Sequence, residues 1–249
     1  MTLIETLLLI GVGIIAGGLN TLAGGGSMLT LPLLIFMGLP SAEANASNRV
    51  AIFIQNIFAV RGFKSKGVAV FPYAYWVAIS ACLGAVLGSM IAADIEDALF
   101  NRILAIVMIL VMLATVLKPL ITAKGGQEIF NRRQNAWSIL AFFFVGVYGG
   151  FIQAGVGFLM IAALSLIHGL GMAKVNSIKV FVALSYTFFA LIVFVINDLI
   201  RWEYGLTLAV GNAIGGWFMS RWSVSIPDQY VRGFLLVTVG ALAVKLWFF

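Results

Sequence analysis

Long apolar segments separated by short polar stretches make up nearly the whole chain. The apolar runs are continuous rather than alternating in polarity, so they predict membrane-spanning helices and not barrel strands. The pattern therefore predicts an all-α integral membrane protein, a polytopic helical bundle. We expect five segments, a polar linker and five further segments: 3–22, 27–39, 44–63, 68–93 and 98–121, then 136–153, 156–170, 173–197, 202–221 and 229–249.

Composition supports a membrane protein. Hydrophobic residues make up 62% of the chain and charged residues 10%, and the mean hydropathy is +1.10. A soluble domain has about 45–50% apolar and about 25% charged residues. The net charge of +6 arises from basic residues in short loops, where they set membrane orientation. We therefore expect the lipid bilayer, and no nucleic acid, among the partners.

The two halves of the chain resemble each other when the sequence is shifted by 131 positions. The shift places Ala23–Gly26 on Ala154–Gly157, and it aligns Asn45 with Asn176 without a gap. Such a repeat indicates two related halves, each organised around a glycine-broken apolar segment. We predict a first membrane repeat over 1–121, a linker over 122–135 and a second membrane repeat over 136–249.

The glycine run Gly24–Gly26 predicts a break between helices, because each glycine inside a helix costs about 1 kcal/mol relative to alanine. The alternative is that these small residues serve helix–helix packing. Behind the run, segment 27–39 would form a helix only about 20 Å long, against about 30 Å of hydrocarbon, and Pro32 would kink or weaken it. We expect short helices next to each glycine break, either as re-entrant pairs or as two half-spans.

The distribution of charge predicts the orientation of the chain. The loop after the third segment, with Arg61, Lys64 and Lys66, and the linker 122–135 are basic, whereas the loop 94–97 between them is acidic. Positive-inside placement puts the two basic loops in the cytoplasm and both chain termini outside. Each half then crosses the membrane an odd number of times, so the two repeats are inverted. In secondary transporters, inverted repeats with glycine-interrupted segments point to the binding site.

The third segment of each half carries most of the polar side chains. At helical spacing, Asn45, Asn48 and Arg49 share one face, and in the second half Asn176 and Lys179 share the equivalent face. Ionisable residues within membrane segments are costly and usually face the interior or a wet cavity. The alternative is that the two cations snorkel to the headgroups.

A small oxyanion would suit this set of groups. Half-helix N-termini after the glycine turns offer N–H groups and partial positive charge. Arg49 can donate two parallel hydrogen bonds to one oxyanion, and Lys179 adds a compact positive charge. The single histidine, the single cysteine and the few acids predict no catalytic group, metal site or cofactor. The predicted substrate-binding residues are Gly24, Gly25, Gly26, Ser27, Asn45, Asn48, Arg49, Gln153, Gly155, Gly157, Asn176 and Lys179.

The sequence resembles the TauE/SafE sulfite-exporter family of membrane permeases. The resemblance rests on Ala23–Ser27 with Leu31–Pro32 and Gly38–Pro40, the asparagine-rich third segment, and Gly155–Gly157 in the second half. It covers nearly the whole chain. It implies a transporter of the bacterial inner membrane that moves small sulfur-containing anions, such as sulfite or organosulfonates, usually outward.

Other functions fit parts of the pattern. An anion channel is compatible with inverted repeats, and a cation-coupled importer of a small organic anion differs from an exporter only in direction and coupling. An intramembrane enzyme would need an acid pair, a serine–histidine pair or a metal cluster in the spans, and none is found. Assembly into a homo-oligomer and coupling to a proton gradient both stay open.

Overall fold

In the computed structural model, every regular element of the described residues is a helix. The structure describes residues 1–22, 24–68, 73–121 and 128–222, with the side chains of 111–121 excepted. The helices are α1 (Leu3–Leu22), α2 (Ser27–Phe36), α3 (Ser41–Ser65), α4 (Tyr73–Ala93), α5 (Asp97–Ile121), α6 (Arg132–Phe151), α7 (Val156–His168), α8 (Met172–Ile196) and α9 (Trp202–Trp222).

These helices confirm the all-α fold class and correspond to the first nine predicted segments. The tenth predicted segment, 229–249, lies outside the described residues. Helix α6 begins at Arg132, upstream of the predicted apolar segment 136–153. The Asn131 side chain accepts a hydrogen bond of 2.9 Å from the backbone N–H of Gln134. This N-cap satisfies a donor that would otherwise be unpaired and extends the helix upstream.

The distribution of side chains is that of a membrane protein. Three of the described helices, α1, α4 and α8, are long and apolar enough to span a bilayer. Among the described residues, large apolar side chains are exposed on the outside of the bundle, whereas several amides and the cations Arg49 and Lys179 are buried within it. Such an arrangement is unfavourable in water but favourable in lipid, where polar groups need partners inside the protein.

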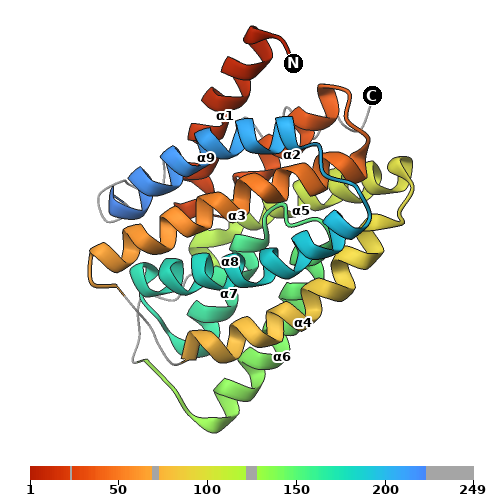
Figure 1. Ribbon diagram of the computed structural model, residues 1–249. Coiled ribbons are helices and arrows are strands. Elements are labelled where there is room, and N and C mark those ends of the chain that lie inside the picture. The colour runs from red at the N-terminus through yellow and green to blue at the C-terminus, as the bar shows by residue number, and fades with distance from the viewer. Residues whose placement is uncertain (23, 69–72, 122–127, 223–249) are drawn as a thin grey trace.

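The helices pack in pairs that join the two halves. Helices α1 and α9 lie side by side at one flank and α4 and α6 at the opposite flank, with α3 and α8 between them (Figure 1). The 131-residue shift relates α1 to α6 and α4 to α9, so each flanking pair is exchanged with the other. Helix α3 also packs on α9 as α8 packs on α4. Every one of these contacts is between halves.

The backbone conformation recurs at the spacing of the sequence repeat. Seven described residues have a positive φ angle, which L-amino acids other than glycine rarely adopt. Six of them form three pairs separated by 131 positions, so the same turns occur at matching places in both halves. The pairs are Gly24 with Gly155 (φ 80° and 73°), Gly38 with Gly169 (93° and 66°) and Gly67 with Asp198 (72° and 53°).

Ion pairs between an acidic and a basic side chain lie at both ends of the bundle. At one end, Glu43 forms a bidentate ion pair with Arg201, at 2.6 and 2.7 Å, and this carboxylate raises the pKa of Arg201. The same end holds Asp97, whose side chain accepts a hydrogen bond from the backbone N–H at the start of α3. At the other end, Lys174 at the start of α8 pairs with Glu128 at 2.6 Å.

Candidate anion site at two crossed glycine turns

The glycine turns of the two halves, Gly24–Gly26 and Gly155–Gly157, touch each other, and we call them the crossed turns. A Cβ atom placed on Gly24 would lie 2.2 Å from the Cα of Gly157, and one placed on Gly157 would lie 2.2 Å from the Cα of Gly24. No side chain fits between two backbones at this distance. The glycine breaks therefore bring together two segments that lie more than 130 positions apart in the sequence.

Each turn leads directly into a short helix, so two helix N-termini meet at this contact. In the first half, the carbonyls of Gly25 and Gly26 accept the N–H groups of Met28 and Leu29, and α2 begins at Ser27. In the second half, Gly155 stands at the N-cap of α7. Each helix N-terminus carries about half a positive charge. Two of them side by side form a positive region inside an apolar bundle.

In the part of the chain that the structure describes, two buried hydrogen-bond donors without partners lie at the start of α2, and a third belongs to Arg49 on α3. Among the described residues, the Ser27 hydroxyl, the Asn48 amide nitrogen and the Arg49 Nε have no partner, although these residues are at most 2% exposed. The Asn48 side chain is held against the first turn of α2, because its oxygen accepts from the Thr30 hydroxyl at 2.7 Å. Buried polar groups are almost always hydrogen-bonded, so donors of this kind indicate a place for a ligand or water.

Arg49 binds the C-terminal end of α6. Its two terminal nitrogens donate to the carbonyls of Gly149 and Gly150, the second at 2.8 Å. Asn45, one turn earlier on α3, donates to the next carbonyl, that of Phe151, at 2.7 Å. The last carbonyls of a helix have no partner within it and favour a cation. Arg49 and Asn45 therefore satisfy the broken end of α6 inside the bundle.

Lys179 makes the equivalent contact at the end of α1. Its ammonium group donates to the Thr21 carbonyl at 2.8 Å and to the Asn176 side-chain oxygen at 2.9 Å. Both residues of this pair lie on α8 and are at most 5% exposed. The third helix of each half thus supplies a buried cation to the first helix of the other half.

The structure places the predicted residues in two groups. Gly24, Gly25, Gly26, Ser27, Gly155 and Gly157 form or border the crossed turns, and the Gln153 carbonyl accepts the Val156 N–H within the second turn. Asn45, Arg49, Asn176 and Lys179 lie at the broken helix ends, where their hydrogen bonds go to the protein itself. Asn48 joins the two groups, because it follows Asn45 on α3 and is bonded to α2.

Other residues that support the turns were not singled out from the sequence. The Tyr148 hydroxyl donates to the Ala154 carbonyl inside the second turn. In the first half, Asn20 donates to Gln55 at 3.1 Å, and Gln55 donates to Thr21 at 3.4 Å. An available signal was that Asn20 is a lone amide in an apolar run, one turn before the glycines.

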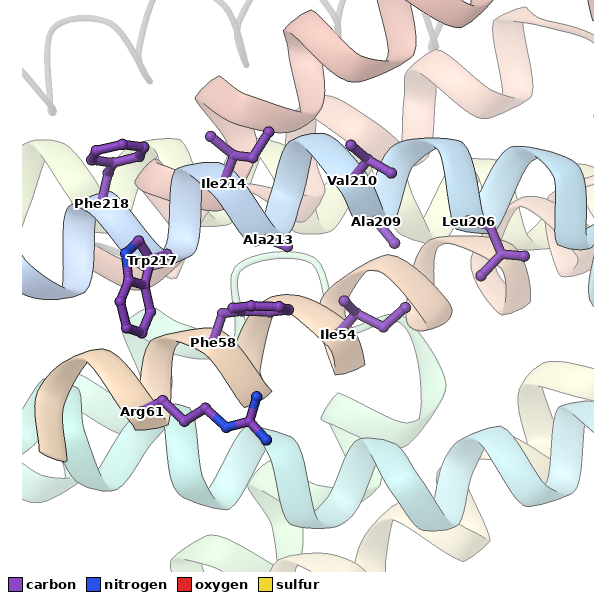
Figure 2. A pocket seen from close by; sticks show the side chains of 10 residues that line it. All are labelled: Ile54, Phe58, Arg61, Leu206, Ala209, Val210, Ala213, Ile214, Trp217 and Phe218. Atoms are coloured by element: carbon purple, nitrogen blue, oxygen red, sulfur yellow. The ribbon is translucent and has the colours of Figure 1, made fainter. Parts of the chain in front are cut away.

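A cavity of about 670 Å³ lies elsewhere, between α3 and α9 on the outer face of the bundle (Figure 2). Its lining is apolar except for Arg61, and none of the predicted site residues contributes to it. It is therefore separate from the crossed turns.

Short helices that begin at glycine turns inside an apolar bundle, with buried cations at the broken ends, define a membrane protein of the transporter class. The chain belongs to the sulfite exporter TauE/SafE family, whose model matches residues 9–246. This match confirms the resemblance seen in the glycine motifs. The protein is therefore a membrane transporter and not an enzyme.

Relatives from other bacteria agree with this assignment. The chain is 24% identical over 233 residues to the probable membrane transporter protein ORF9 of Sinorhizobium sp., covering 93% of this chain and 88% of that protein. It is 25% identical over 238 residues to the probable membrane transporter protein YfcA of Escherichia coli (strain K12), covering 94% and 87%. A probable membrane transporter protein of Haemophilus influenzae is 26% identical over 206 residues, covering 82% and 79%. No solved structure matches the chain.

Proposed function

We propose that this transporter exports small sulfur-containing anions, such as sulfite or organosulfonates, across the bacterial inner membrane. The observation that carries the proposal is the contact between Gly24 and Gly157, which brings the N-termini of α2 and α7 together inside the bundle. The family's description as sulfite exporters supports the choice of substrate class.

The electrostatics of the crossed turns favour an anion. Two adjacent helix N-termini repel each other because both carry partial positive charge. An anion between them is attracted to both and offsets this repulsion. Ser27 and Asn48 add neutral donors beside the turns, and both are buried without partners for those donors among the described residues. A sulfur oxyanion has several acceptor oxygens and can take donors from all of these groups at once.

The two buried cations have a supporting role in this proposal. Arg49 and Lys179 hold the ends of α6 and α1 that lead into the turns. Their charge also adds to the positive potential of the site, because charges in a dry interior are weakly screened. Asn45 and Asn176 keep the cations and the helix ends in place. Each cation thus positions a turn and attracts the substrate over a distance.

We further propose that the two repeats are inverted and that the site opens alternately to the two sides of the membrane. The exchanged packing of α1 on α9 and α6 on α4 supports a two-fold relation between the halves. The basic residues around 61–66 and in the linker, against the acidic loop 94–97, support a cytoplasmic linker and external termini by the positive-inside rule. Movement of one set of helices against the other would open the crossed turns alternately to each side.

Transport by purified protein in proteoliposomes tests this function. We expect saturable flux of at least one of sulfite, thiosulfate and sulfoacetate, with no single-channel currents. Ser27→Ala and Asn48→Ala should each weaken apparent affinity about tenfold, since a hydrogen bond to a charged ligand is worth about 1.5–3 kcal/mol. Ser89→Ala is the matched control: it is equally buried, but its hydroxyl bonds within its own helix α4.

Different results would contradict different parts of the proposal. Unchanged affinity in both Ser27→Ala and Asn48→Ala would remove the substrate from the crossed turns. Non-saturating flux with single-channel currents would indicate an anion channel, and accumulation driven by an inward proton gradient would indicate a coupled importer. Failure of every sulfur anion, with transport of another anion, would overturn the substrate class alone.

A further inference from the structure

The cavity between α3 and α9 has the shape of a groove along the outer face of the bundle. Along α9 its lining extends from Leu206 to Phe218, which is about 18 Å at 1.5 Å per residue. Half of the hydrocarbon core of a bilayer is about 15 Å thick. The groove is therefore as long as one leaflet, and it lies among the exposed apolar side chains that face lipid.

One end of the groove carries positive charge. Arg61 is exposed, lines the groove about one turn before the end of α3 and donates to no described residue. Arg221 lies 5.1 Å from the ring of Trp217, which also lines the groove. Phe58 packs edge-on against the same ring, with centroids 6.4 Å apart. Figure 2 shows Arg61 below Phe58 and Trp217 at one end of the row of apolar side chains.

The charge at this end is not a consequence of the repeat. The 131-residue shift places Ile192 at the position equivalent to Arg61, so the second half has no cation there. Nearby, Lys64 and Lys66 are also exposed at the end of α3. An apolar groove about as long as one leaflet is thick, with arginine at one end, matches one occupant in both shape and charge.

We propose that this groove binds an anionic phospholipid, with an acyl chain along α9 and the phosphate at Arg61. Trp217 lies in the last two turns of α9, and tryptophans near the ends of membrane spans often meet the headgroup region. Arginine matches a phosphate with two parallel hydrogen bonds. The site is distinct from the crossed glycine turns and does not depend on the transported substrate.

Native mass spectrometry of the purified protein tests this binding, with equal amounts of phosphatidylglycerol and phosphatidylcholine as the probes. We expect the wild-type protein to retain phosphatidylglycerol preferentially. Arg61→Gln should reduce that preference at least tenfold, whereas Arg133→Gln, which removes an exposed cation of α6, should not change it. Ala213→Phe and Leu206→Trp fill the groove and should reduce retention of both lipids.

Ile196→Trp is the control for a bulky ring on the surface, because Ile196 is 77% exposed and does not line the groove. Since Leu206 is itself exposed, Leu206→Trp tests the groove even if Ala213→Phe fails to fold. An unchanged preference in Arg61→Gln, or full lipid retention in Leu206→Trp, would overturn the proposal. A lipid-free dimer that Leu206→Trp dissociates would show that the face binds a second copy instead.

Discussion

The two buried cations do the same task in different ways. Arg49 uses both terminal nitrogens on two successive carbonyls of α6, and Asn45 satisfies a third. Lys179 reaches the Thr21 carbonyl of α1 and the side chain of Asn176 on its own helix. The two cations are also offset by one position in the repeat alignment, since Lys179 aligns with Asn48.

This comparison shows that both halves keep the same interaction, a cation bonded to carbonyl oxygen at a helix end, although the residue that makes it differs. A helix that ends inside the membrane leaves carbonyls that water cannot reach. Either cation can satisfy them from the third helix of the opposite half. The forked arginine closes its helix end more completely, so we expect the two halves to differ in how strongly they depend on their cation.

The largest expected effect is that of Arg49→Gln. The variant loses charge-assisted bonds to two buried carbonyls, each worth about 1.5–3 kcal/mol, so unfolding in mixed micelles should become easier by about 3 kcal/mol or more. The stability of Arg49→Lys should lie between those of the wild type and Arg49→Gln, because an ammonium group cannot reproduce the two parallel bonds of a guanidinium. The exposed Arg133→Gln serves as the control. Wild-type stability in Arg49→Gln would contradict the helix-end role.

Substitutions in the crossed turns should destabilise the protein nearly as much. The substitution in the first half should cost more than the one in the second half. Gly24→Ala and Gly157→Ala both place a Cβ 2.2 Å from the opposing backbone. Gly24 also has a φ of 80°, where a side chain costs about 1–2 kcal/mol more. We expect stability losses of about 3 and about 2 kcal/mol, measured by the same unfolding titration. Gly11→Ala, with no atom within 4 Å, should not destabilise.

Removal of the second cation should cost less than removal of the first. Lys179→Met gives up the bond to the Thr21 carbonyl, so we expect a loss of about 1.5–3 kcal/mol in the free energy of unfolding. If Lys179→Met proved more damaging than Arg49→Gln, the proposed difference between the two helix ends would be reversed.

The smallest expected effects on stability are those of Asn45→Ala and Asn176→Ala, and the two should differ. Asn45→Ala removes a bond to the Phe151 carbonyl and should cost about 1 kcal/mol. Asn176→Ala removes an acceptor from Lys179 but no described bond to a helix end, so its cost should be smaller. Equal losses of stability from the two substitutions would show that the amides act only through their cations.

Much of the architecture could be predicted from the order of residues. Continuous apolar runs, short segments behind glycines and polar third helices are local properties, and a helix needs only local hydrogen bonds within one segment. Nine predicted segments correspond to helices. Helix α6 begins upstream of its predicted segment because the Asn131 cap involves only two or three residues, which apolar patterning cannot locate.

The sequence by itself determined the class of protein, its helical segments, its glycine breaks and the identity of its buried polar residues. Periodicity shows which residues share a helix face, but it does not show what that face meets. Only the tertiary structure decided that Arg49 meets Gly149 and that Lys179 meets Thr21, partners 100 and 158 positions apart. It also decided that Gly24 lies against Gly157. Such contacts depend on how whole helices pack, because the groups they satisfy belong to a different half of the chain.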